Sequence, residues 1–211
     1  MTQTVANPIV VFDLGGVLFD WNPDYLFREL IPDAGERAWF LSEVCNPDWN
    51  IQQDAGRSLA EATATLSARH PAYAEQIAAF YGRWPETLRG TLVEGMAIFE
   101  TLEDAGIPLY ALTNWSAETF PYAWERYPFM QRFKDVLVSG RELLIKPDPR
   151  IYALMLERIR VHHPDAQPAQ LIFIDDSLKN ADGARACGWH AIHHTDPAET
   201  TAQLRAWGLP L

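Results

Sequence analysis

The sequence of 211 residues contains only two cysteines, Cys45 and Cys187, which is too few for a disulfide framework or a cysteine-based zinc site. It also lacks an apolar run of about 20 residues, the length that a membrane-spanning helix needs. No Lys or Arg precedes Arg28, so the basic region of a secretory signal peptide is missing. We therefore expect a cytoplasmic protein that does not enter a membrane.

Positive charge is scarce as well, because 17 Lys and Arg stand against 28 Asp and Glu and the formal net charge is −11. Nucleic-acid binding needs basic side chains that displace phosphate counterions, so we expect no nucleic-acid partner. Hydrophobic residues make up 48% of the chain and charged residues 21%, which is typical of a globular protein with a substantial core. The length fits one large domain, or a domain that carries a smaller inserted one.

Short apolar segments predict the strands of a buried parallel sheet. Residues 9–12 and 171–174 are rich in β-branched and aromatic residues, are too short for helices, and are each followed by an aspartate. Weaker strand candidates cover residues 107–112, 136–138 and 190–193.

Helix signals lie between these strands. Gly106 is placed to end one helix, the pair Asp148-Pro149 begins another, and Ser177 and Asp196 are placed to cap two more. Because strands alternate with helices, we predict an α/β fold with a doubly wound, Rossmann-like parallel sheet that is covered by helices on both faces.

Residues 21–89 interrupt this alternation, because they contain helical segments but no convincing strand. Ser58 and Glu61 form a capping box that begins one of these helices. The segment is rich in aromatic residues, which we interpret as the core of a small helical bundle in preference to an aromatic substrate cage. We therefore expect residues 1–20 and 90–211 to form the α/β core, and residues 21–89 to form a helical insertion after the first strand.

Polar residues follow four of the predicted strands, where ligands bind in an open parallel sheet. They are Asp13, Thr113, Asn114, Lys146, Asp175, Asp176 and Ser177. Three carboxylates that lie close together repel one another unless a cation lies among them, and hard oxygen ligands suit Mg²⁺. The ammonium, amide and hydroxyl groups then suit a phosphate. Each residue alone is typical of a turn or a helix cap, but their joint placement predicts a site for magnesium and phosphate.

Four motifs follow one another along the chain: Asp13-Leu14-Gly15-Gly16-Val17, Thr113-Asn114, Lys146-Pro147 and Asp175-Asp176-Ser177. Together with the helical insertion they resemble the motifs of the haloacid dehalogenase-like hydrolase superfamily. The branch that the sequence resembles includes capped sugar-phosphate phosphatases and the N-terminal phosphatase domain of soluble epoxide hydrolase. The resemblance covers essentially the whole chain and likens residues 21–89 to a cap domain. It implies hydrolysis of a small phosphorylated metabolite with Mg²⁺ as the cofactor.

The resemblance also implies how the metal is held. Asp13 would attack phosphorus to form an aspartyl-phosphate, which water then hydrolyses. Its other carboxylate oxygen, the backbone carbonyl of Gly15 and the carboxylate of Asp176 would bind Mg²⁺, and Asp175 would bind it directly or through water. We expect Asn180, one helical turn beyond Asp176, to orient the Asp176 carboxylate.

On the phosphate side, the resemblance implies that Thr113 and the amide of Asn114 hold phosphoryl oxygens, while Lys146 offsets negative charge. One position departs from the family, because Gly15 stands where family phosphatases usually carry an aspartate that acts as general acid and base. Loss of such a group typically costs about 10²–10⁴-fold in rate. We therefore expect either a preference for good leaving groups, such as anomeric or acyl phosphates, or another acid, for which Asp20 is the nearest candidate.

Two alternatives stay open. A metal-independent 2-haloacid dehalogenase, in which Asp13 attacks carbon and expels a halide, needs no acid at position 15 but leaves the repulsion between Asp175 and Asp176 unrelieved. A non-turnover phosphate-binding or regulatory protein uses similar residues, as response-regulator receiver domains do, but there the acidic pair comes first in the chain. We favour the phosphatase on the charge argument.

Overall fold

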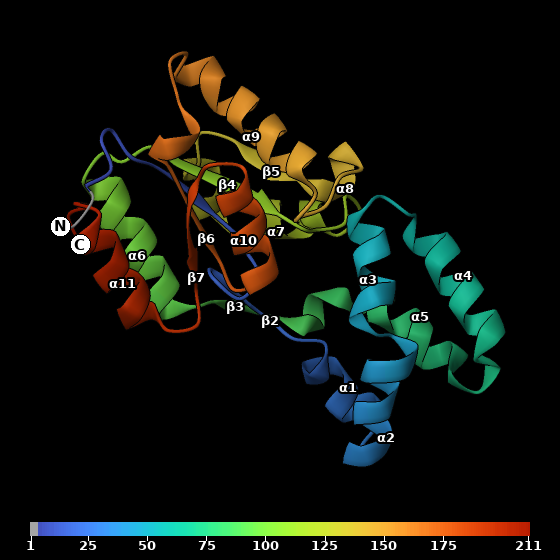
Figure 1. Ribbon diagram of the computed structural model, residues 1–211. Helices are drawn as coiled ribbons and strands as arrows, with labels where there is room; N and C mark the ends of the chain where they lie inside the picture. Colours follow the sequence, from blue (N-terminus) through green and yellow to red (C-terminus); the bar gives the residue numbers. More distant parts are fainter. Residues whose placement is uncertain (1–3) are drawn as a thin grey trace.

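The computed structural model describes residues 4–211, and a five-stranded parallel sheet lies at its centre (Figure 1). Its strands are β1 (Ile9–Phe12), β4 (Leu109–Thr113), β5 (Val136–Val138), β6 (Leu171–Asp175) and β7 (His190–His193). Their order across the sheet is β5-β4-β1-β6-β7, and each neighbouring pair is parallel. The α/β fold with a parallel sheet is therefore confirmed.

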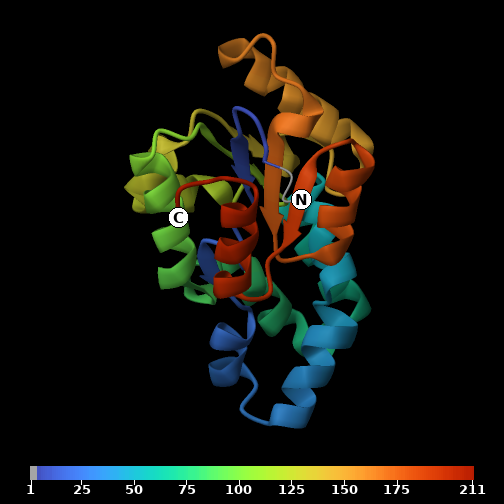
Figure 2. The same ribbon diagram turned by 60° about the vertical axis from the view of Figure 1, so that its left-hand side comes forward.

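Helices cover both faces of this sheet (Figure 2). One face carries α6 (Val93–Asp104), α7 (Phe120–Arg126) and α11 (Pro197–Ala206), and the other carries α9 (Pro149–His162) and α10 (Leu178–Ala186). Val10 and Phe12 of β1 pack in the first hydrophobic cluster, whereas Ile9 and Val11 pack in the second. A strand that is buried on both faces is uniformly apolar, which explains the unbroken hydrophobic run.

Of the three N-cap side chains predicted for helices of the α/β core, two make capping hydrogen bonds. Asp148 accepts a hydrogen bond from the backbone N–H of Arg150, and Asp196 accepts hydrogen bonds from the first turn of α11. Ser177 occupies the N-cap position of α10, but its hydroxyl makes no capping hydrogen bond. Instead its backbone N–H donates to Asp175 Oδ1 at 2.8 Å, so the loop turns around the Asp175 carboxylate.

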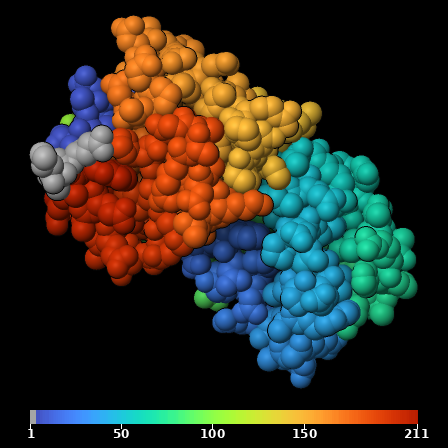
Figure 3. All heavy atoms as spheres, viewed as in Figure 1, coloured from blue at the N-terminus to red at the C-terminus, as the bar shows by residue number. Residues whose placement is uncertain are grey.

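Residues 21–89, called the helical segment below, form a separate lobe beside the sheet (Figures 1 and 3). Its helices are α1 (Asp24–Leu30), α2 (Ala34–Trp39), α3 (Pro47–Asp54), α4 (Leu59–Arg69) and α5 (Ala74–Gly82). They pack around their own hydrophobic cluster, which contains Phe27, Phe40, Trp49 and Phe80. Ser58 accepts a hydrogen bond from the backbone N–H of Glu61 at 3.3 Å, as expected for the start of α4.

A short antiparallel ribbon links the two lobes. Its strands, β2 (Phe19–Trp21) and β3 (Leu88–Thr91), pair Phe19 with Thr91 and Asp20 with Gly90. Neither strand is predicted from the sequence, because three or four residues are too few to show an alternating pattern. We propose that this ribbon marks the boundary between an α/β core, residues 1–20 and 90–211, and a helical cap; residues 1–3 lie outside the described range.

The remaining helix, α8 (Ser139–Glu142), follows β5 and contacts α3 of the helical segment. Among residues 4–211, no helix combines the length and the apolar character that crossing a bilayer requires.

Candidate active site

Three of the predicted carboxylates meet at the carboxyl edge of the sheet. Asp13 follows β1, whereas Asp175 and Asp176 lie at the end of β6, the neighbouring strand. Each offers an oxygen atom, and these three oxygens lie within 4.8 Å of one another. Parallel topology brings them together, because the carboxyl ends of adjacent parallel strands share one edge. An all-oxygen donor set of this kind fits Mg²⁺.

Lys146 lies against two of these carboxylates. Its Nζ atom is 2.8 Å from Asp13 Oδ1 and 2.7 Å from Asp175 Oδ2, and it donates a further hydrogen bond to the carbonyl of Leu112 at 2.9 Å. Burial acts to lower the pKa of Lys146, but the carboxylates of Asp13 and Asp175 outweigh it and raise this pKa above the usual value. The ammonium group therefore stays charged inside the protein.

The side chain of Asn114 holds the backbone of Lys146 in place. Its Oδ1 atom accepts a hydrogen bond from the Lys146 N–H at 2.8 Å, and its Nδ2 atom donates to the Lys146 carbonyl at 3.1 Å. The side-chain amide of Asn114 is therefore engaged within the protein, on both sides of the Lys146 backbone. Thr113, at the end of β4, is buried and lines the same pocket as Asp13.

Asp13 carries a strongly perturbed carboxyl group. Burial raises its pKa to about 7, the nearby carboxylates of Asp175 and Asp176 act in the same direction, and Lys146 opposes them. The backbone N–H of Leu14 donates to Asp13 Oδ1 at 2.7 Å. A cation among the three carboxylates would act in the same direction as Lys146 and keep Asp13 ionised, so the electrostatics also fit a metal.

The two adjacent aspartates differ in burial, because Asp175 is buried and Asp176 is exposed. Asp175 is fully buried, and besides Lys146 it accepts hydrogen bonds from the Ser177 N–H at 2.8 Å and from Asn180 Nδ2 at 3.1 and 3.2 Å. The expectation that Asn180 orients Asp176 is therefore wrong. Asn180 uses its side-chain amide on both oxygens of Asp175, whereas the side chain of Asp176 is exposed.

The loop after β1 approaches Asp176 closely. Gly16 has a φ of +69°, and a Cβ atom added to it would lie 2.2 Å from Asp176 Oδ2. Only glycine fits such a close approach with this backbone conformation. Gly15 is different, because a Cβ atom there would meet no atom within 4 Å. The loop thus brings the backbone of Gly16 against the Asp176 carboxylate.

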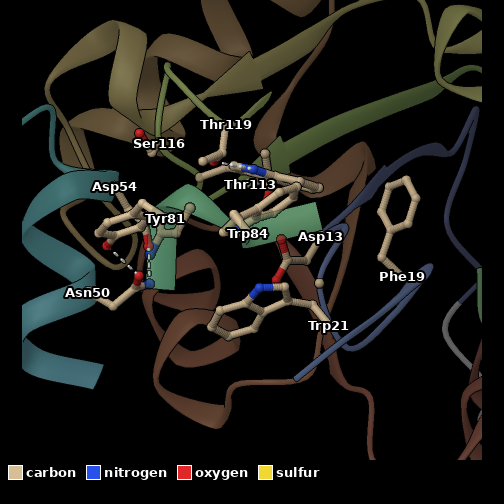
Figure 4. A pocket seen from close by; sticks show the side chains of 13 residues that line it. Asp13, Phe19, Trp21, Asn50, Asp54, Tyr81, Trp84, Thr113, Ser116 and Thr119 are labelled. Atoms are coloured by element: carbon tan, nitrogen blue, oxygen red, sulfur yellow. Dashed lines mark hydrogen bonds between the residues drawn. The ribbon is translucent and has the colours of Figure 1, made fainter. Parts of the chain in front are cut away.

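A pocket of about 540 Å³, which includes space open to solvent, lies beside Asp13 between the two lobes (Figure 4). Five aromatic side chains line it: Phe19, Trp21, Tyr81, Trp84 and Trp115. Polar groups from both lobes also line it, among them Asp13 and Thr113 from the core and Asn50 and Asp54 from α3. Apolar walls with a few convergent polar groups are typical of a small-molecule site.

Two expectations from the sequence need correction. The interpretation of the aromatic residues as bundle core holds for Phe27 and Trp49, but Trp21 and Trp84 line the pocket. Asp20 lies outside the set of described residues that line the pocket, and its Oδ1 atom accepts a hydrogen bond from the Tyr25 hydroxyl at 2.8 Å. The β2–β3 ribbon turns Asp20 towards α1, so it is not placed to act as an acid in the pocket.

Asn50 and Asp54 are pocket residues that the sequence pattern did not single out. Their spacing of four residues places both side chains on one face of α3, which is a signal that could have grouped them. The spacing alone does not place that face opposite Asp13, because the position of α3 on the core depends on contacts with residues far along the chain.

Comparison with known proteins agrees with this architecture. A sequence model of the haloacid dehalogenase-like hydrolases matches residues 8–188. The sesquiterpene phosphatase astK of Aspergillus oryzae is 29% identical over 196 residues, which cover 92% of this chain and 93% of that protein.

Solved structures share the fold at low sequence identity. A HAD family enzyme from Bacteroides thetaiotaomicron, in complex with magnesium and inorganic phosphate, superposes with a TM-score of 0.67 at 20% identity and covers 92% of this chain and 98% of its own. The L-2-haloacid dehalogenase of Xanthobacter autotrophicus gives a TM-score of 0.60 at 16% identity, with coverage of 96% and 84%. With its family match over most of its length, the chain belongs to the haloacid dehalogenase-like hydrolases.

Proposed function

We propose that the protein is a Mg²⁺-dependent phosphomonoesterase that forms an aspartyl-phosphate on Asp13. The observation that carries this proposal is the cluster of three carboxylates, two of which contact the buried Lys146. Three negative charges against one ammonium group leave an excess that a divalent cation relieves. A metal-independent dehalogenase would have to keep this excess uncompensated, which is why we favour the phosphatase.

Asp13, Asp176 and the carbonyl of Gly15 would hold the cation, with Asp175 next to them, and the cation would supply charge neutralisation for the phosphoryl group. A carboxylate oxygen of Asp13 attacks phosphorus, the bond to the leaving oxygen breaks, and that oxygen takes up a proton. Water then attacks the aspartyl-phosphate, releasing inorganic phosphate and the free carboxylate. Lys146 offsets the charge of nucleophile and phosphate in both steps.

The Thr113 hydroxyl and the backbone N–H of Asn114 support this assignment as phosphate-binding groups. Thr113 lies at the end of β4 in the pocket wall, and Asn114 follows it. Because β4 is the parallel neighbour of β1, the two residues lie at the same edge of the sheet as Asp13 and line the same pocket.

For the substrate, we propose a small organic phosphate with an apolar carbon skeleton. The pocket beside Asp13 has aromatic walls from both lobes, among them Trp21 and Trp84 (Figure 4). The similarity to a protein named as a sesquiterpene phosphatase supports the same class. The loop that follows β1 supplies no general acid, because Gly15 has no side chain. Unless another residue supplies the proton, the enzyme would favour substrates with good leaving groups.

Phosphate release tests this proposal directly. We expect turnover of p-nitrophenyl phosphate and of isoprenoid monophosphates with Mg²⁺, a loss of at least about 100-fold in excess EDTA, and recovery on adding Mg²⁺ back. Isoprenoid phosphates should show a lower KM than sugar phosphates of similar leaving-group pKa. Unchanged turnover in EDTA, or halide release from 2-haloacids without phosphatase activity, would contradict the proposal. Stoichiometric phosphate binding without turnover would instead indicate a regulatory role.

Replacing Gly16 with alanine should weaken metal binding. The added Cβ atom would collide with the Asp176 carboxylate, and a φ of +69° is unfavourable for alanine, so the loop or Asp176 has to move. Disturbing the groups that hold a metal ligand in place typically lowers the affinity for the metal by about 10–100-fold. Titration calorimetry with Mg²⁺ would measure this loss. Gly15→Ala is the matched control, because its Cβ atom meets open space. Equal losses in the two variants would contradict this account.

A further inference from the structure

The proposed reaction needs a proton donor for the leaving oxygen, and neither Gly15 nor Asp20 supplies it. A different carboxyl group lines the pocket, namely Asp54 at the end of α3 in the helical segment. We propose that Asp54 is the general acid that protonates the leaving group, and that it then acts as the general base towards water. This inference rests on the proposed phosphatase function.

Contacts between the two lobes fix the position of Asp54. The hydroxyl of Ser139 donates to the Asp54 carbonyl at 2.6 Å, and the backbone N–H of Ser116 interacts with the Asp54 carboxyl group. Nearby, the Leu59 N–H donates to the Glu118 carboxylate at 2.8 Å. The end of α3 therefore rests on the start of α8 and on the loop that follows β4, which also carries Asn114. Asp54 belongs to the helical segment by sequence but lines the pocket at the carboxyl edge of the sheet.

The side chain of Asp54 faces the pocket that Asp13 lines from the opposite lobe (Figure 4). Asn50 Nδ2 donates to Asp54 Oδ2 at 3.3 Å, and Asn50 is itself held by the Tyr81 hydroxyl, which donates to its Oδ1 atom at 2.8 Å. Gln53 in turn donates to the Tyr81 oxygen at 2.8 Å. This chain of hydrogen bonds sets the orientation of the carboxyl group before any substrate enters.

The environment suits proton transfer in both directions. Burial raises the pKa of Asp54 to about 7, while the Ser116 backbone N–H and the charge of Lys146 act to lower it. A group whose pKa lies near the working pH gives and takes protons with similar ease. Tyr81, which lines the same pocket, stays neutral, because its own burial raises the pKa of the phenol.

The proton balance follows from these positions. Asp54 starts protonated and passes its proton to the leaving oxygen as the bond from phosphorus to that oxygen breaks and the bond to Asp13 forms. The resulting Asp54 carboxylate then takes a proton from the water that attacks the aspartyl-phosphate. Release of phosphate restores both carboxyl groups to their starting states, so no further reactant is needed.

The test compares wild type, Asp54→Asn and Asp20→Asn with Mg²⁺ under single-turnover conditions. Asparagine keeps the size of the side chain and one oxygen acceptor, but it has no proton to give. For Asp54→Asn we expect the first turnover of an alkyl phosphate to slow by about 10²–10⁴-fold. With p-nitrophenyl phosphate, whose leaving group needs little protonation, we expect less than about a tenfold loss, followed by slow turnover because water lacks its base.

Across a series of aryl and alkyl phosphates, wild type and Asp20→Asn should therefore show a shallow dependence of rate on leaving-group pKa, and Asp54→Asn a steep one. A steep dependence in wild type overturns the proposal, and this measurement needs no variant to fold. Equal losses for good and poor leaving groups in Asp54→Asn would show that Asp54 only holds α3 on the core, and a steep dependence in Asp20→Asn would move the role to Asp20. If wild type hydrolyses none of the series, the phosphatase function itself fails.

A second variant checks the assignment by rescue. The space at Gly15 accepts a side chain, since a Cβ atom there meets nothing within 4 Å. Adding Gly15→Asp to Asp54→Asn places a carboxyl group where other family phosphatases carry one. We expect the first turnover of the alkyl phosphate to recover at least about tenfold, whereas Gly15→Ala in the same background should recover nothing. Recovery with alanine as well would overturn the proposal.

Discussion

An Asp13→Asn variant is expected to lose at least about 10⁴-fold in turnover of p-nitrophenyl phosphate, because an amide oxygen does not form the acyl-phosphate that the mechanism requires. The variant keeps the shape of the site, since Lys146 retains its contacts with Asp175 and the Leu112 carbonyl. Acid quenching during turnover of a ³²P-labelled substrate should trap label on the wild-type protein and none on the variant. Label that persists in Asp13→Asn would place the nucleophile elsewhere.

Asp13→Asn should also change how the stability of the folded protein depends on pH, which distinguishes this variant from one that folds poorly. In the metal-free protein the pKa of Asp13 is raised from 3.8 to about 7, so its ionised form is less favourable in the folded than in the unfolded chain. The folded wild type in EDTA therefore loses stability as the pH rises through the window from about 4 to about 7. Asp13→Asn lacks this ionisation, so its melting temperature in EDTA should fall less across that window. If the melting temperatures of the two proteins fell equally across this window, ionisation of Asp13 would not be the cause of the lost stability.

The cluster of catalytic candidates could be predicted from the sequence because parallel topology does the positioning. Residues 9–12 and 171–174 are apolar runs that end at aspartates, and β1 and β6 are neighbours in the sheet. Once a parallel sheet is inferred, the residues after its strands have to meet at one edge. Asp13 and Asp175 are close enough to contact the same Lys146 ammonium group for this reason.

The acid that we now assign to Asp54 could not be predicted in the same way. Its place in the pocket depends on how α3 docks on the core, and the contact between Asp54 and Ser139 joins residues 85 positions apart. Nothing in the local pattern of α3 specifies that contact. Proximity along the chain favoured Asp20 instead, and the structure shows that a ribbon too short to recognise turns Asp20 towards Tyr25.

The roles of the two amides show a related limit. Both Asn114 and Asn180 stand beside predicted site residues, and the sequence suggested that each acts on a ligand or on the nearer carboxylate. In the structure Asn114 supports the Lys146 backbone, and Asn180 binds Asp175 instead of Asp176. Spacing places a residue at the site, but the direction of its side chain depends on backbone detail that single-sequence reasoning does not contain.

Lys146→Met should be costly for both folding and activity. The ammonium group is fully buried between Asp13 and Asp175, and methionine keeps much of the length of the side chain without the charge. Breaking a buried ion pair by removing one partner typically costs about 3–5 kcal/mol, because the remaining charge is left uncompensated. Urea unfolding in EDTA should show a loss of this size, and turnover with Mg²⁺ should fall by at least about 10²–10³-fold. Lys179→Met, at an exposed position of α10, is the control and should change neither quantity.

Adding Asp175→Asn to Lys146→Met distinguishes the two contributions of this lysine. Asp175 is completely buried, so neutralising it removes the charge that Lys146→Met leaves without a partner. Stability in EDTA should then recover by more than half, since loss of both charges is far less costly than loss of one. Turnover should not recover, because the positive charge that faces Asp13 and the phosphoryl group is still missing. If turnover returned together with stability, Lys146 would serve only to neutralise Asp175, and its part in phosphoryl transfer would have to be abandoned.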